Sequence, residues 1–203
     1  MSWISDLNEL EAIYGNPGKA ATVKVAASIT ETYGKLIAAS PFLILATAGT
    51  DALDCSPRGE QGPVVRVQDP TTLLLPDRRG NNRIDSLRNI VRDPRIGLLF
   101  LIPGSGTTLR VNGTARISRD ETLLQSFAVD GHEPRTVIVV TVGSVFFQCA
   151  RAIVRSRIWD PESHVPEDAI PTPGHILEAQ SQAIIDAAAY DAEWPERARR
   201  TLW

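Results

Sequence analysis

Six short segments rich in β-branched and aromatic residues constrain the fold of this chain more than any other feature. Such residues suit the pleated, half-buried surface of a sheet, and short runs of Gly, Pro, Asp and Asn separate them. Only two helical patterns, 83–93 and 119–131, interrupt them, so a doubly wound parallel fold is disfavoured. The sequence predicts an antiparallel sheet or barrel built from residues 42–48, 64–69, 71–76, 96–102, 108–118 and 136–150.

Helical spacing of apolar residues predicts peripheral helices at both ends of the chain. Leu7, Leu10 and Ile13 repeat at this spacing in the first segment, and residues 29–37 form a second one. We expect both helices to pack against the sheet. Near the other end, the alanine-rich residues 175–194 predict a final helix.

The length of 203 residues and the 43% hydrophobic content suit one domain with a single core. Four prolines in residues 161–174 predict an extended surface arm. The predicted fold class is therefore α+β, mainly β with peripheral helices, in one domain over residues 1–203. Its parts are the N-terminal helices at residues 1–40, the barrel core at residues 41–160, and the C-terminal arm with its helix at residues 161–203.

Charge and cysteine usage exclude several classes of protein. A net charge of −3 and a pI near 5.6 argue against a nucleic-acid or membrane-surface binder, which needs a broad basic face. No apolar run approaches the roughly 20 residues of a membrane span. Cys55 and Cys149 lie far apart, which favours a reducing cytoplasm, and the three histidines lack metal-ligand spacing, so no metal site is predicted.

Positive charge is concentrated at one place, where the sequence reads LLLPDRRGNNRIDSLRNI. We expect the leucines to end a strand and Asp85 or Ser86 to open a helix. The unpaired N–H groups of the first helical turn and the helix dipole would then favour a bound phosphate or carboxylate. Arg78 and Arg83 could add charged contacts, and Gly80 would allow a sharp turn. An exposed turn with an ordinary cap explains the same residues, so both interpretations stay open.

A second polar cluster, DCSPRGEQGP at residues 54–63, follows the first predicted strand. A strand edge with glycine and exposed N–H groups could receive a planar polar ring. A hairpin connection with scattered charges is the simpler explanation.

Several motifs together resemble a known family. LATA, SPRG, TLLLPDRRGNNRIDSLRNI, DPRIGLLFLIPG, TLRVNGTARIS and RSRIWDP occur in the order and spacing of the pyridoxamine 5'-phosphate oxidase-related flavoproteins, especially a bacterial subgroup with a PDRxGNNRxDSL string. The resemblance covers residues 36–161. It implies an FMN-binding split β-barrel that acts as a homodimer, with flavin sites at the subunit interface.

The resemblance also assigns residues to the cofactor. The phosphate end of FMN is assigned to Arg78, Asn81, Asn82, Arg83 and Ser86. The ribityl chain is assigned to Asp77, and the isoalloxazine ring to Ser56, Arg58 and Gly59. Two further residues, Arg155 and Trp159, are expected to reach a flavin across the interface.

The implied activity is that of an FMN-dependent oxidoreductase acting on NAD(P)H or a small substrate. The flavin supplies the redox chemistry, so no side chain is assigned as a catalytic acid or base. The basic residues with which the true oxidases hold pyridoxal phosphate have no counterpart in residues 161–180, which argues against that substrate. A flavin-sequestering protein without turnover is the alternative, as is a split barrel that holds haem or the deazaflavin F420. The few histidines disfavour haem, and the compact GNNR string disfavours the long tail of F420.

Overall fold

The computed structural model describes residues 1–50 and 53–202. Residues 51–52, in the predicted turn after the first strand, and 203, at the end of the predicted C-terminal part, lie outside the described residues. The strands are β1 (Phe42–Ala48), β2 (Leu53–Gly59), β3 (Arg66–Asp69), β4 (Thr72–Pro76), β5 (Arg95–Leu101), β6 (Thr108–Ser118) and β7 (Val137–Gln148). The helices are α1 (Leu7–Tyr14), α2 (Lys19–Val23), α3 (Glu31–Ala38), α4 (Asp85–Arg92), α5 (Glu121–Gln125), α6 (Arg151–Ser156), α7 (Pro173–Gln180), α8 (Ala187–Ala192) and α9 (Trp194–Thr201).

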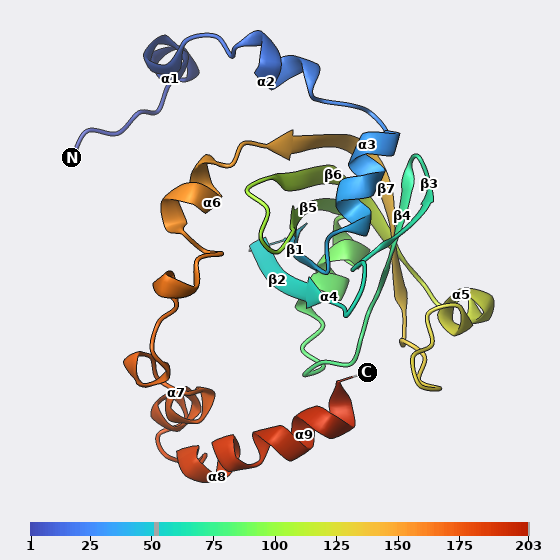
Figure 1. Cartoon of the computed structure of the whole chain (residues 1–203), viewed down its shortest axis with the longest axis vertical. Helices are drawn as coiled ribbons and strands as arrows, with labels where there is room; N and C mark the ends of the chain where they lie inside the picture. Colours follow the sequence, from blue (N-terminus) through green and yellow to red (C-terminus); the bar gives the residue numbers. More distant parts are fainter. Residues whose placement is uncertain (51–52, 203) are drawn as a thin grey trace.

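The strands form one antiparallel sheet in the order β2-β1-β5-β6-β7-β4-β3, which curls around a common core (Figure 1). Alternate residues of β1 and β5 are buried, as a period of two requires, and they include Leu43, Leu45 and Phe100. Helix α3 packs against β3, β6 and β7, and α4 packs against β1, β2 and β6. The predicted fold class, mainly β with peripheral helices, is confirmed.

Strand β2 is the element that the residue pattern missed. The residues suggested a polar connection there, whereas the structure pairs Leu53–Gly59 with the whole of β1, from Ala48 to Phe42. Because β2 is an edge strand among the described residues, Pro57 can occupy it without breaking a sheet hydrogen bond on a second side. Strand pairing here prevails over the weak strand propensity of Asp, Ser, Pro and Gly. The family resemblance had placed Ser56, Arg58 and Gly59 on a strand.

Helix α1 does not pack against the sheet, contrary to the prediction. It has no buried residue, and Leu7 and Ile13 are 74% and 60% exposed. Figure 1 shows α1 and α2 leading away from the barrel. The second predicted helix does pack, because Tyr33 and Ile37 of α3 enter the core.

The single C-terminal helix predicted over 175–194 is divided. Gln182 and Ala183 adopt left-handed φ values of 53° and 63°, which interrupt the helix between α7 and α8. The predicted arm contains two short 3-10 turns, Pro161–Ser163 and Glu167–Ala169. Helices α7, α8 and α9 pack mainly on one another and form an arc that brings the end of α9 toward the loop after β4 (Figure 1). No helix within the described residues has the length and apolar character needed to cross a bilayer.

Candidate functional site

The loop between β4 and α4 has an unusual backbone. Helix α4 begins at Asp85, as predicted, and two preceding residues, Asn82 and Ile84, have left-handed φ values of 62° and 54°. A left-handed conformation in a β-branched residue such as Ile84 costs about 1–3 kcal/mol, and such strain clusters at binding sites. Gly80, where the sequence predicted the sharp turn, has no left-handed φ. The turn is therefore made by Asn82, which tolerates this conformation, and by Ile84, for which it is costly.

This loop and strand β2 line one cavity of about 1500 Å³. The predicted residues that line it are Ser56, Arg58, Gly59, Asp77, Arg78, Asn81, Asn82, Arg83 and Ser86. Thr201 and Leu202, at the end of α9, also contribute to its wall. The two polar clusters, which are separated in sequence by a hairpin, therefore belong to one site.

A chain of hydrogen bonds joins the two clusters. Arg58 Nη1 donates to Ser56 Oγ at 2.9 Å, and the hydroxyls of Ser56 and Ser86 lie 2.9 Å apart. Ser86 Oγ in turn donates to Asp54 Oδ2 at 2.5 Å. Because the Ser86 proton goes to Asp54, Ser56 must donate to Ser86, so the chain runs from the cation to the carboxylate. This links the edge strand β2 to the first turn of α4.

Arg78 has its guanidinium bound within the chain. Its Nε donates to Glu60 Oε1 at 2.7 Å, and its Nη1 donates to the Phe127 carbonyl oxygen at 2.7 Å. The two side chains of this ion pair are 18% and 20% exposed. Arg78 thus connects three segments of the chain. Its predicted contact with a phosphate stays a prediction.

Arg83, in contrast, is the more accessible cation. Its side chain is 76% exposed, and its Nε lies 2.8 Å from Asp85 Oδ2. The hydrogen bond with Asp85 raises the pKa of Arg83 above its usual value, so the guanidinium is charged at neutral pH. Its position beside the start of α4 adds a positive charge to the positive end of that helix.

Sequence reasoning missed Arg135 and Thr136, which also line the cavity. Arg135 Nη1 donates to Asn82 Oδ1 at 3.1 Å, although the two residues are far apart in sequence. Pairing of Pro76 with Val137 in the β4–β7 ladder places these segments side by side. A predicted antiparallel pairing of these two strands was the signal that could have found them.

Asp77 is a half-buried carboxylate in the wall of this cavity. Burial raises its pKa above the ordinary value, and the positive charges of Arg58 and Arg135 oppose part of that rise. The Asp77 Oδ1 to Arg58 Nη2 distance of 3.9 Å is long for an ion pair. The protein therefore keeps an incompletely compensated carboxylate at this position.

This predicts a pH-dependent effect of Asp77→Asn. When the folded-state pKa of a carboxyl group lies above its unfolded-state pKa, stability falls as the pH rises between the two values. The reason is that the carboxyl group ionises more easily in the unfolded chain. We expect Asp77→Asn to gain stability over the unmodified chain on going from about pH 4 to about pH 7. Urea denaturation at both pH values measures this.

Asp93→Asn is a control of opposite sign. A hydrogen bond from Arg95 lowers the pKa of Asp93 to about 2, so its carboxylate stabilises the fold above the ordinary carboxyl pKa. This variant should lose stability relative to the unmodified chain mainly between about pH 2 and about pH 4, and should change little from about pH 4 to about pH 7. The same trend in both variants would contradict our account of Asp77.

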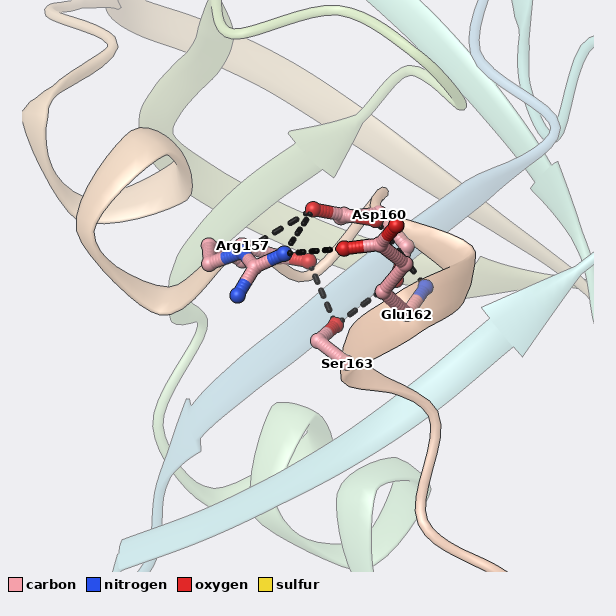
Figure 2. Close-up of polar contacts among 4 residues, drawn as sticks. All are labelled: Arg157, Asp160, Glu162 and Ser163. Carbon is pink, nitrogen blue, oxygen red and sulfur yellow. Dashed lines mark hydrogen bonds and ion pairs between the residues drawn. The ribbon is translucent and has the colours of Figure 1, made fainter.

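Arg155 and Trp159 do not line the cavity of their own chain. Arg155 is exposed on α6, and Trp159 Nε1 donates to the Ser105 carbonyl oxygen at 2.8 Å. Figure 2 shows how the turn between them is held: Arg157 Nη2 lies 2.6 Å from Asp160 and 3.1 Å from Glu162. Their assignment to a flavin on a second subunit stays a prediction.

Comparison with known proteins identifies the family. The model of the family described as pyridoxamine 5'-phosphate oxidase matches residues 29–149, more than half of the chain. The chain belongs to the pyridoxamine 5'-phosphate oxidase family. Members of the pyridoxamine 5'-phosphate oxidase family typically bind a flavin. No curated protein sequence matches the chain significantly.

A solved structure of HupZ shows the same fold. A single-residue variant of HupZ from Group A Streptococcus aligns with a TM-score of 0.50 and 19% identity, over 59% of this chain and 99% of the HupZ chain. A protein from Clostridium acetobutylicum aligns with a TM-score of 0.45 and 15% identity, over 58% of this chain and 86% of its own. That protein is related to general stress protein 26 of Bacillus subtilis and is described as of the pyridoxinephosphate oxidase family. The likeness to HupZ supports the split-barrel-like fold of the pyridoxamine 5'-phosphate oxidase family.

The residues of the cavity fit a flavin phosphate of the kind that the pyridoxamine 5'-phosphate oxidase family binds. Arg58 Nε and Thr136 Oγ1 are buried and have no hydrogen-bond partner within the described residues. Both residues line the cavity, so its wall contains hydrogen-bonding groups that a ligand could satisfy. Arginine forks, amide side chains and a helix N-terminus together are the donor set that binds phosphate groups.

Proposed function

We propose that the chain binds FMN in this cavity and acts as an FMN-dependent oxidoreductase. The observation that supports this most directly is that the accessible cation Arg83, the first turn of α4 and the edge strand β2 line one cavity. A phosphate group on the α4 side and a planar ring along β2 would use both ends of that cavity. This arrangement explains why two polar clusters of different character converge.

Within this proposal, the phosphate lies with Arg83 and the N–H groups at the start of α4, and Asn81 and Asn82 supply neutral donors. Asp77 is positioned to accept hydrogen bonds from hydroxyl groups of the ribityl chain. Ser56 and Arg58, fixed by their hydrogen bond of 2.9 Å, orient the ring system. The flavin, when bound, supplies the hydride or electron transfer itself.

The proposal predicts a yellow protein with turnover. We expect the purified chain to show absorption bands near about 370 and 450 nm, as an oxidised flavin does. Steady-state assays with NADH and NADPH in the presence of a dye acceptor should then show flavin-dependent oxidation of one of them. Flavin bands without turnover by either donor would point to a small reduced substrate or to a flavin-sequestering protein. A chain that binds no added FMN would contradict the proposal.

We further propose that the functional form is a homodimer. The outermost strands of the described sheet, β2 and β3, leave edges open to pairing. Apolar side chains on the peripheral helices are exposed, among them Leu7, Ile13, Val154 and Ile184. A second copy that covers such surfaces would bury apolar area that is otherwise in contact with water.

Sedimentation tests the dimer. At micromolar concentration we expect a species of twice the 22.1 kDa chain mass. Detection of the 22.1 kDa species alone, with FMN bound, would show that the site does not need a second subunit.

A further inference from the structure

A second cavity, of about 670 Å³, lies between α3, the β3–β4 hairpin and the segment after α5. This volume falls within the range of about 300–1,000 Å³ that is typical of small-molecule pockets. Its apolar wall includes Ile29, Ile37, Val65, Pro70, Pro76 and Phe127. None of these lines the flavin cavity, so this is a separate site.

The two cavities share one wall. Glu60 and Arg78 line both of them, and their ion pair at 2.7 Å is anchored to the Phe127 carbonyl oxygen. Because this pair is largely buried and its charges cancel, it closes the flavin cavity on that side and offers no free charge to the second cavity.

The charge available in the second cavity comes from Arg66. Its guanidinium lies over the Phe127 ring, 4.0 Å from the centroid, and donates to Ser126 Oγ at 2.8 Å. Within the described part of the chain Arg66 has no carboxylate partner. The other charged groups at the wall are already engaged: Glu31 pairs with Lys35, and Asp69 accepts two hydrogen bonds from Thr71.

We propose that this cavity binds a small aromatic or polycyclic molecule that carries one acidic group. The rings would lie against the apolar wall, where burial of their surface drives binding. The acidic group would pair with Arg66, whose planar fork suits a carboxylate or sulfonate. Such a ligand binds beside the flavin cavity, and its binding does not require the flavin.

The probe for this site is 1-anilinonaphthalene-8-sulfonate, an aromatic anion. N-phenyl-1-naphthylamine, which has the same rings without the sulfonate, is its neutral counterpart. We expect one sulfonate dye to bind per chain, by fluorescence titration of the FMN-free chain and by calorimetry of the FMN-loaded chain. Arg66→Gln should weaken the sulfonate dye about tenfold, as loss of one charge-assisted contact does, and leave the neutral dye within about twofold.

Gly34→Phe fills the cavity from α3, because Gly34 is one of the residues that line it. A Cβ at Gly34 would meet only Ile29 Cγ2, at 3.8 Å, so the new side chain should be tolerated. We expect it to weaken both dyes more than about tenfold, since their space is taken. Thr32→Phe adds the same ring at an exposed position of α3 that does not line the cavity, and should change neither affinity by more than about twofold.

Several outcomes would overturn this proposal. Displacement of the dye by FMN would place it in the flavin cavity, and unchanged dye affinity in Gly34→Phe would place it elsewhere. Equal affinity of the two dyes would show that Arg66 does not pair with the sulfonate group. Conversion of a dimer to a monomer by Gly34→Phe would show that a second subunit occupies the cavity. The dye titrations of the FMN-free variants do not depend on whether FMN itself binds, and a separate titration of the unmodified chain with FMN establishes that binding.

Discussion

Replacing Arg83 by alanine should weaken FMN binding about ten- to a hundredfold, which corresponds to about 1.5–3 kcal/mol. The guanidinium is accessible and charged beside the start of α4, where a phosphate would also meet free N–H groups. Its pair with Asp85 is exposed, so removal should change folding stability little. Riboflavin, which lacks the phosphate, should lose far less affinity. Titration of both flavins by fluorescence quenching measures these differences.

Arg95→Ala is a closely matched control. Arg95 is also 76% exposed and also pairs with an aspartate two residues away, Asp93, but it lies outside the cavity. It should bind both flavins as the unmodified chain does. Arg83→Lys should recover only part of the FMN affinity, because an ammonium group cannot make a two-pronged contact. Equal losses for FMN and riboflavin in Arg83→Ala would show that Arg83 supports the ring or the fold and not the phosphate.

Replacing Gly113 by alanine should destabilise the fold by about 3 kcal/mol, the upper end of the typical cost of over-packing. Gly113 lies at a bulge between β6 and β7, where Asn112 pairs with Ser144 and Gly113 pairs with Val142. A Cβ there would overlap the carbonyl oxygen of Thr141. Because that atom belongs to the backbone of the central sheet, it cannot move aside without disturbing the ladder. Urea denaturation gives the change in the free energy of unfolding.

Gly97→Ala is the control for this substitution. Gly97 also lies in a central strand, β5, but its Cβ would meet Asn112 Oδ1 at 3.6 Å and Ala46 Cβ at 3.9 Å, which are ordinary contacts. We expect a change of less than about 1 kcal/mol in either direction. If Gly113→Ala and Gly97→Ala were equally stable, the bulge would be free to adapt and our account of it would be wrong.

The candidate site was partly predictable from one contiguous string. Asn81, Asn82, Arg83 and Ser86 are close in sequence, and the start of α4 at Asp85 follows from the end of a strand and the beginning of a helical pattern. Only the family resemblance predicted that β2 belongs to the site, because the composition of β2 by itself is that of a turn. The separate roles of two similar arginines could not be predicted. Glu60 and the Phe127 carbonyl engage Arg78, and neither is near it in sequence.

The sequence by itself determined six of the strands and where α4 starts, since side-chain alternation and helix-start signals act over a few residues. Only the tertiary structure decided that Leu53–Gly59 joins the sheet, that α1 stays unpacked and that Arg135 meets Asn82. These outcomes depend on the register of strand pairing between distant segments. A local pattern does not determine that register, because many pairings bury the same apolar residues and only the complete sheet selects one of them.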